Sequence, residues 1–435
     1  MAKEKQGKKE FLKGAIWIAF GGFTAKIIGA LYRIPLTNLI GGKGLGLYQM
    51  IYPVYCLLLT VSATGIPSSI AKLTAERIAK GKEDYPVFKR AMQLFLLIGL
   101  FGTGLMMLIA PFLARAQGIK EVTGGYFTLA PSVFLVSAIS VFRGWFQGRN
   151  KMYPTALSEI LEQLIKVGVG LLFAYLYRGN VEKAVAYLLL AVTISEGIAV
   201  LLMLFFYGRE KKVKTGERES AKHILKLSIP VTIGAMILPL SNLLDSVLVP
   251  RLLGVYASDA VTLFGLFSGG AVTVINLPVS ICYGIAAASV PSVAGAKKAE
   301  LKRKIFFALG ITFLVGAVST LGLYFFAEEA SSVIFRSLKG EELAILSKLI
   351  KAFSISALTL SCVQTLSACL TAQGKPQYAA LSMTVSVTVK TAVYLFLLRK
   401  PQISVFGLAY ASNACYLVAF LLNLLYNLRV AKRKI

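Results

Sequence analysis

Long runs of hydrophobic residues alternate with short charged segments along the whole chain. Each run reaches the roughly 20 residues that an α-helix needs to cross the hydrocarbon core of a membrane. Several runs exceed 25 residues, which indicates tilt, kinks or ends that lie in the membrane interface. The pattern predicts an all-α, polytopic membrane protein with about 12 transmembrane helices, at residues 12–40, 46–71, 91–113, 126–147, 155–177, 184–207, 223–253, 262–294, 305–327, 343–372, 378–398 and 404–428.

The composition narrows the class of protein. Of the 435 residues, 56% are hydrophobic and only 15% are charged. A soluble domain is close to half apolar and a quarter charged, so this chain lies outside the globular range. The composition therefore excludes both a water-soluble enzyme and an intrinsically disordered chain.

The formal net charge of +27 would suggest nucleic-acid binding in a soluble protein. Here, however, the Lys and Arg residues are distributed unevenly between the two sides of the predicted membrane spans. The N-terminal tail, alternate loops and the C-terminal tail hold 27 Lys and Arg residues, whereas the loops on the opposite side hold 10. Because cytoplasmic loops of membrane proteins are enriched in Lys and Arg, both termini are predicted to be cytoplasmic, with no nucleic-acid partner.

The sequence offers no familiar cofactor or metal chemistry. The five cysteines lie in hydrophobic runs without a CxxC pair, and the chain has a single histidine. No G-x-x-x-x-G-K-[ST] motif is present, so no ATP site is predicted. We therefore expect no cofactor, no metal centre and no enzymatic activity. Any transport would be driven by substrate supply, the membrane potential or a gradient of Na⁺ or H⁺.

The two halves of the sequence repeat each other. Pro67 and Pro291 lie 224 positions apart in similar segments, and Lys166 and Lys390 keep the same spacing. We predict two like-oriented six-helix bundles, at residues 1–210 and 211–435, that form a V around a central cavity. Two such bundles are a known plan for transporters, with the substrate site near the midplane between them.

Ionisable residues inside the hydrophobic runs are the candidate functional residues, because burying them in a membrane is costly. Lys26 and Arg33 lie seven residues apart in the first run, on one face of a helix. Ammonium and guanidinium groups suit a bulky anion such as a phosphate. Alternatively, Arg33 extends its guanidinium to the membrane surface or pairs with an acid for structural reasons.

A second group lies in the fifth run. Glu159, Glu162 and Lys166 share one helical face, and Glu162 precedes Lys166 by the favourable four residues. Glu196 in the sixth run and Lys390 in the eleventh are candidate partners across the bundles. The alternative is an internal salt bridge that neutralises the helix for insertion.

Asp245 lies between Pro239 and Pro250 in the seventh run. A carboxylate in a helix broken by prolines could bind Na⁺ or a proton together with freed backbone carbonyls. It could equally pair with Arg251 or with a cation of the first run.

Four segments resemble one family of membrane proteins. They are residues 22–34 (GFTAKIIGALYRI), 44–48 (GLGLY), 146–152 (FQGRNKM) and 154–163 (PTALSEILEQ). Together they resemble the polysaccharide-transporter branch of the MOP exporters, and in particular the stage V sporulation protein B family. The resemblance extends over essentially the whole chain, and its most specific part is the stretch from 146 to 163.

The resemblance implies a flippase of the bacterial cytoplasmic membrane, surrounded by membrane lipids and acting as a monomer by alternating access. Its substrate would be an undecaprenyl-pyrophosphate-linked saccharide, either the peptidoglycan precursor lipid II or another polysaccharide unit. We predict Lys26, Arg33, Lys166 and Lys390 as substrate-binding residues, and Glu159, Glu162, Glu196 and Asp245 as coupling or cavity acids. The family's lipid II flippases carry further arginines in their second and eighth helices, whereas the matching stretches 57–60 and 271–273 are uncharged here.

Two other functions are weighed against this one. A cation-coupled multidrug exporter of the related MATE branch would be expected to place carboxylates, rather than Lys26 and Arg33, in its first helix. A non-transporting membrane scaffold would not need charged residues on one buried face of that helix.

Overall fold

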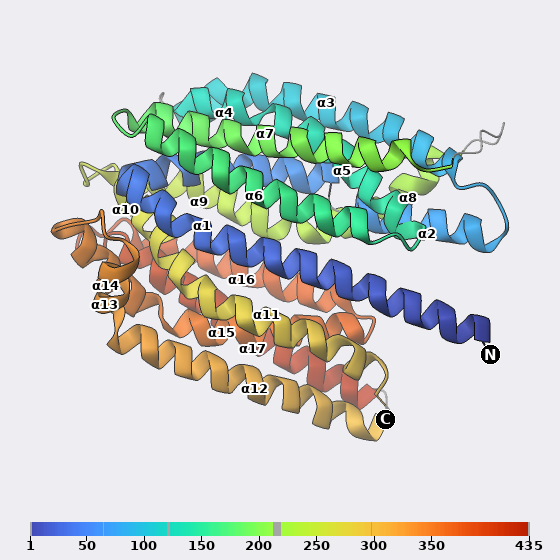
Figure 1. The fold of residues 1–435 in the computed structure, drawn as a ribbon. Helices are drawn as coiled ribbons and strands as arrows, with labels where there is room; N and C mark the ends of the chain where they lie inside the picture. The colour runs from blue at the N-terminus through green and yellow to red at the C-terminus, as the bar shows by residue number, and fades with distance from the viewer. Residues whose placement is uncertain (1, 64, 120–121, 212–218, 297, 434–435) are drawn as a thin grey trace. The chain divides into compact units, whose positions relative to one another are not determined.

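The protein was analysed as a computed structural model, which describes residues 2–63, 65–119, 122–211, 219–296 and 298–433. Every regular element in these ranges is a helix (Figure 1). The predicted all-α class is confirmed.

The helices divide into two compact units. Unit 1 comprises Met1–Tyr32 and Met50–Leu243, and unit 2 comprises Arg33–Gln49 and Leu244–Ile435. The division at residue 210 that the sequence suggests stays a prediction. The units of the structure are discontinuous in sequence. Both take part of α1 (Ala2–Ala63), and both take part of α9 (Ile237–Leu253).

The remaining helices each belong to one unit. Unit 1 contains α2 (Ile66–Ala79), α3 (Tyr85–Ala116), α4 (Thr123–Leu129), α5 (Pro131–Gly148), α6 (Tyr153–Leu176), α7 (Val181–Gly208) and α8 (Ala221–Ala235). Unit 2 contains α10 (Ala260–Gly265), the π-helix η2 (Leu266–Ala271), α11 (Val272–Ala294), α12 (Lys298–Phe325), α13 (Ala327–Ile334), α14 (Glu341–Phe353), α15 (Ile355–Ala372), α16 (Pro376–Leu397) and α17 (Phe406–Arg433).

The helices are long and apolar enough to cross a membrane repeatedly. Within the described residues, nine helices have the length and composition of a membrane span, or ten if the bent pair α8 and α9 counts as one span. The count is lower than twelve for identifiable reasons. Helix α6 has 24 residues but carries three charged side chains, and α1, with 62 residues, is about three membrane thicknesses long. The chain is a multi-pass membrane protein.

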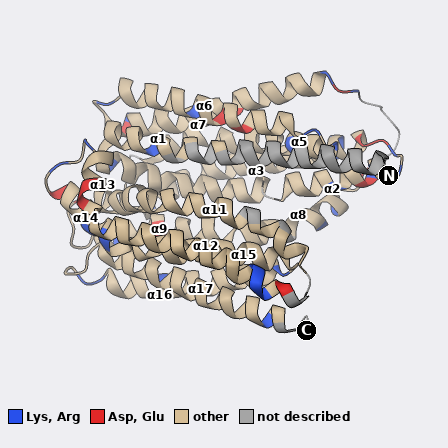
Figure 2. Cartoon of the chain, turned by 60° about the horizontal axis from the view of Figure 1, so that its bottom comes forward, with Lys and Arg blue, Asp and Glu red and all other residues tan. Residues whose placement is uncertain are grey.

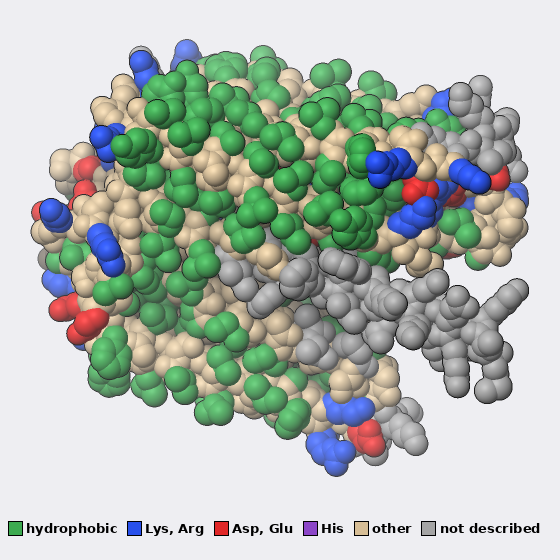
Figure 3. All heavy atoms as spheres, viewed as in Figure 1, with side chains coloured by type: hydrophobic (Ala, Val, Ile, Leu, Met, Phe, Trp, Pro, Cys, Tyr) green, Lys and Arg blue, Asp and Glu red, His purple; other side chains and the backbone are tan. Residues whose placement is uncertain are grey.

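The outer surfaces of single helices fit a lipid environment. Phe101 of α3 is 72% exposed and Phe307 of α12 is 71% exposed, each among other exposed apolar side chains of its helix. Figure 3 shows hydrophobic side chains covering the helices, with Lys, Arg, Asp and Glu gathered towards the helix ends. Figure 2 shows the same concentration of charged residues at the ends. Such apolar surface is typical of helices that face lipid tails.

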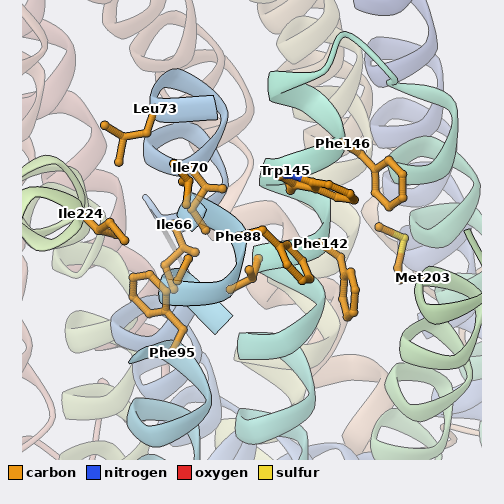
Figure 4. Packing of buried hydrophobic residues seen from close by; sticks show 13 residues of the cluster. Ile66, Ile70, Leu73, Phe88, Phe95, Phe142, Trp145, Phe146, Met203 and Ile224 are labelled. Atoms are coloured by element: carbon orange, nitrogen blue, oxygen red, sulfur yellow. The ribbon is translucent and has the colours of Figure 1, made fainter. Parts of the chain in front are cut away.

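An aromatic core holds unit 1 together (Figure 4). Phe88 of α3, Phe142 and Trp145 of α5, and Tyr207 of α7 pack on one another, with 4.9 Å between the ring centres of Phe88 and Trp145. Ile224 of α8 joins this core. This core therefore holds α2, α3, α5, α7 and α8 together.

A charged clamp lies beside this core. Arg149, within the 146–152 motif, donates two hydrogen bonds to Asp84, at 2.5 and 2.7 Å, and one to Glu210 at 2.9 Å. Its guanidinium lies 3.8 Å from the ring centre of Trp145. Burial alone would lower the pKa of Arg149, but the hydrogen bonds and charges of Asp84 and then Glu210 outweigh it, so the pKa is raised. The clamp joins the segments that follow α2, α5 and α7.

In unit 2, the middle segment of α1 packs closely on α10 and η2. The helix kinks at Gly41, whose φ of 68° favours glycine. A Cβ atom on Gly265 would lie 2.5 Å from the carbonyl oxygen of Gly42, so only glycine fits there. This close contact places Arg33–Gln49 within unit 2.

Candidate functional site

A polar cavity of about 280 Å³ lies inside unit 1. It is lined by the last part of α1 together with α5, α6 and α7. Its polar lining consists of Tyr52, Tyr55, Ser140, Arg143, Glu162, Gln163, Lys166 and Glu196, and its apolar lining of Leu59, Ala63, Val136, Ile139 and Val192. Charged and hydroxyl groups are thus gathered inside a bundle whose outer surface is apolar.

One wall of the cavity is an ion pair between α5 and α6. Arg143 Nη2 lies 3.0 Å from a carboxylate oxygen of Glu162, and Arg143 Nε donates to Ser158 Oγ at 2.9 Å. The sequence analysis missed Arg143, because a single arginine in the hydrophobic run 126–147 has no visible partner nearby in sequence. The internal salt bridge weighed for Glu162 forms, but with Arg143.

A deeply buried acid on α7 also lines the cavity. Glu196 is 1% exposed and accepts a hydrogen bond on Oε1 from the hydroxyl of Tyr55, itself 2% exposed. Its other oxygen, Oε2, has no hydrogen-bond partner among the residues that the structure describes, and neither has Oε1 of Gln163. Two acceptor atoms in this unit therefore have no hydrogen-bond partner in the described part of the chain.

The structure brings three of the predicted residues together in this cavity. Glu162, Lys166 and Glu196 all line the cavity. Glu159 and Lys166, which are seven residues apart, both lie on α6. Glu159 is half-buried and lies outside the cavity lining.

Arg33 lies in unit 2, in the middle segment of α1. Its Nη1 donates to Thr273 Oγ1 at 3.1 Å, and Thr273 in turn donates to the carbonyl oxygen of Gly269 at 2.5 Å. Gly269 belongs to the π-helix η2, an irregularity that often marks functional sites. In the described part of the chain, no carboxylate lies within ion-pair distance of Arg33. The side chain of Lys26 lies outside the described residues.

Asp245 and Lys390 form an ion pair inside unit 2. The ammonium of Lys390 on α16 contacts Oδ2 of Asp245 on α9, and each side chain is 11% exposed. Among the described residues, Asp245 therefore forms its ion pair with Lys390 rather than with Arg251. The pair is internal to unit 2, so the expectation that Lys390 partners a residue across the bundles is not met by this contact.

Metal ligation has no candidate in the described residues, where no three His, Cys, Asp or Glu side chains are grouped closely enough to hold an ion. All five cysteines are free.

Comparisons with known proteins agree with this architecture. Residues 11–294 match the family described as polysaccharide biosynthesis protein. The chain is 27% identical to stage V sporulation protein B of Bacillus subtilis (strain 168) over 428 residues, which cover 93% of this chain and 81% of that one.

Two solved structures share the fold. One is the inward-facing conformation of a multidrug resistance MATE family transporter of the MOP superfamily, with a TM-score of 0.81, 17% identity, and coverage of 94% of this chain and 95% of that one. The other is the lipid II flippase MurJ in an inward closed conformation, with a TM-score of 0.75, 14% identity, and coverage of 96% and 90%. The matched family covers well over half of the sequence, and the resemblance seen in the motifs is confirmed: the chain belongs to the polysaccharide biosynthesis protein family.

Proposed function

We propose that this protein is a flippase that moves an undecaprenyl-pyrophosphate-linked saccharide across the bacterial cytoplasmic membrane by alternating access. The saccharide is that of lipid II or of another polysaccharide unit. Membership of the polysaccharide biosynthesis family supports the proposal, as does the similarity to a sporulation protein and to a lipid II flippase. No covalent chemistry is required, so the protein is a transporter rather than an enzyme.

The observation that carries the proposal is the guanidinium of Arg33, for which the described residues provide no acid partner. A cation in a membrane-spanning segment is normally paired, because removing an isolated charge from water is costly. Arg33 has a hydroxyl partner, Thr273, and no acid partner among the described residues. Its planar fork suits two oxygens of a phosphate group, so a pyrophosphate would complete its bonding.

Transport of cationic drugs is the second candidate, because the fold is also that of MATE transporters. The cavity of unit 1 contains two carboxylates, which a cationic drug would need. It also contains Arg143 and Lys166, so its formal charges cancel. The charge balance therefore favours the lipid-linked saccharide over the drug.

The direction and coupling of transport follow from two further proposals. The Lys and Arg distribution supports cytoplasmic termini. The proposed direction, with the head group leaving the cytoplasmic leaflet, follows from the family resemblance. Asp245 is the candidate for coupling to H⁺ or Na⁺, with its ion pair to Lys390 broken during the cycle.

The test is binding of undecaprenyl pyrophosphate to purified Arg33→Ala, Arg33→Lys and Lys26→Ala. Losing a charge-assisted hydrogen bond costs about 1.5–3 kcal/mol, which corresponds to about one to two decades of affinity. We expect this loss for Arg33→Ala, partial recovery for Arg33→Lys and a smaller loss for Lys26→Ala. Arg399→Ala, which removes an exposed arginine of unit 2, is the control. Parental affinity in a stable Arg33→Ala protein would show that Arg33 does not hold the pyrophosphate.

A further inference from the structure

A groove of about 420 Å³ lies between α11 and α12 of unit 2 (Figure 1). It is lined by Ile285, Ser289, Ser292 and Val293 of α11 and by Arg303, Lys304, Phe307, Ala308 and Ile311 of α12. All of these residues belong to unit 2, and the cavity of unit 1 shares none of them. The α11–α12 groove is therefore a separate feature, which the proposed function does not use.

The lining of this groove changes from charged to apolar along the helices. On α12, Arg303, Phe307 and Ile311 follow one another at intervals of four residues, so they share one face of the helix over about 12 Å. On α11, Ile285 and Ser292 are seven residues apart and also share a face. Only three residues connect the two helices, so the hydroxyl and the basic group lie towards the connected end and both isoleucines lie away from it.

This change of lining matches the layers of a membrane. Glu300–Phe325 of α12 is long and apolar enough to cross the bilayer, which places Arg303 near the first turn of the span and Ile311 about three turns inside. Phe307 is 71% exposed and Ile311 is 39% exposed. Lys and Arg are favourable at the level of lipid head groups, and apolar side chains at the level of lipid chains. The groove therefore presents a basic end to the head groups and an apolar end to the chains.

The basic end has hydrogen-bond donors available for a ligand. No carboxylate of the described chain forms an ion pair with Arg303. Lys304 Nζ lies 3.4 Å from a carboxylate oxygen of Glu300, and both side chains are partly exposed. A pair of this kind is weak, so an anion can compete for the ammonium. The guanidinium suits two phosphate oxygens, and the exposed hydroxyl of Ser292 is a further donor.

Charge and size together select the class of ligand. Inorganic phosphate would leave the apolar lining unused, and a zwitterionic phospholipid would bring its own ammonium group close to two cations. A volume of about 420 Å³ corresponds to about fourteen waters at liquid density. This space is enough for a phosphate–glycerol unit and the first carbons of one acyl chain.

We propose that the α11–α12 groove binds an anionic phospholipid of the bilayer. The phosphate of the lipid accepts hydrogen bonds from Arg303 and Lys304, and one acyl chain packs on the apolar lining. The lipid lies in the leaflet at the start of α12, which the Lys and Arg distribution predicts to be the cytoplasmic one. The proposal does not depend on what the protein transports.

Native mass spectrometry of the purified full-length protein tests this, because it counts bound lipids and measures their affinity. Phosphatidylglycerol, which is anionic, is compared with zwitterionic phosphatidylcholine of the same chains. One basic residue near an anionic lipid strengthens binding about fivefold. Replacing both Arg303 and Lys304 by Gln should therefore weaken the tightest phosphatidylglycerol site about 25-fold and leave phosphatidylcholine unchanged. Arg303→Lys keeps the charge and should retain most of the affinity.

Arg90 of α3 provides the matched control for the charge. It lies in a largely apolar groove of about 430 Å³ on unit 1, whose described lining holds no second cation, and its Nη1 lies 3.5 Å from Oε1 of Gln93. Arg90→Gln should leave the tightest phosphatidylglycerol site unchanged. A loss in Arg90→Gln as large as that in the double variant would show a general effect of basic residues at helix ends, and would overturn the proposal.

A second pair of variants changes the groove and keeps both cations. Ile285→Trp places a larger side chain in the space of the acyl chain and should weaken the tightest phosphatidylglycerol site. Ile281→Trp is the matched control, because Ile281 lies one turn away on α11, is 60% exposed and is outside the lining. Parental affinity in Ile285→Trp would show that the lipid does not occupy the groove, and would contradict the proposal.

Undecaprenyl pyrophosphate distinguishes a bilayer phospholipid from the transported lipid. At equal concentration it should not displace phosphatidylglycerol from this site, and the double variant should bind it with parental affinity. Displacement, together with a loss of undecaprenyl pyrophosphate binding in the double variant, would assign the groove to the transported lipid and refute the phospholipid site. Arg33→Ala should bind phosphatidylglycerol like the parent, so a failure of the proposed function leaves this test intact.

Discussion

The ion pair of Asp245 and Lys390 gives a sharp prediction about stability. Both side chains are 11% exposed, so neither can be solvated if the other is removed. Asp245→Asn leaves a buried ammonium without its counter-charge, and breaking a buried pair in this way costs about 3–5 kcal/mol. Replacing both partners, as in Asp245→Asn with Lys390→Met, removes the stranded charge and should restore most of that loss.

Denaturant unfolding of the full-length protein in detergent measures these differences. The control is Glu328→Gln, which removes an exposed acid of unit 2 and should change stability by less than about 0.5 kcal/mol. The expected order is parent and control most stable, the double variant slightly below them, and each single variant far below. Losses in the two single variants that simply add in the double variant would refute the reasoning, because the two charges would then not interact.

Two other predictions concern the pH dependence of stability and the orientation of the chain in the membrane. Burial, and then the charge of Asp259, raise the pKa of Glu342 at the start of α14, so folding favours the protonated carboxyl. Stability should therefore fall as the pH rises from the ordinary glutamate range through the raised pKa, and Glu342→Gln should flatten this slope in thermal unfolding between acid and neutral pH. In a background without the five native cysteines, Lys339→Cys should react with an impermeant thiol reagent in intact cells and Lys375→Cys should not. The reverse labelling pattern would show that the orientation is opposite to the predicted one.

Much of the fold was predictable because membrane insertion imposes a simple pattern. Runs of about 20 apolar residues indicate helices, because an α-helix satisfies its backbone hydrogen bonds within one segment where lipid offers no partners. The middle of α1 could not be assigned in this way. Residues 33–49 continue the same helical pattern, and contacts with residues far away in sequence, such as that between Gly42 and Gly265, join them to unit 2.

The candidate sites were predictable where their residues are close in sequence. Helical spacing in α6 identified Glu162 and Lys166, which do line one cavity. Arg143 was missed because its partner is on the next helix, and Lys390 was found without its partner because Asp245 is 145 residues away. Pairing between helices depends on their rotation and depth, which hydrophobic patterning does not determine.

The central claim is that the protein moves a lipid-linked saccharide, and reconstitution into liposomes tests it most directly. Fluorescent undecaprenyl-pyrophosphate-linked saccharide is placed in one leaflet, and its arrival in the other is followed with an impermeant quencher. The account predicts protein-dependent translocation of this lipid that Arg33→Ala abolishes. Ion-driven export of a cationic drug, with no movement of the lipid, would contradict it.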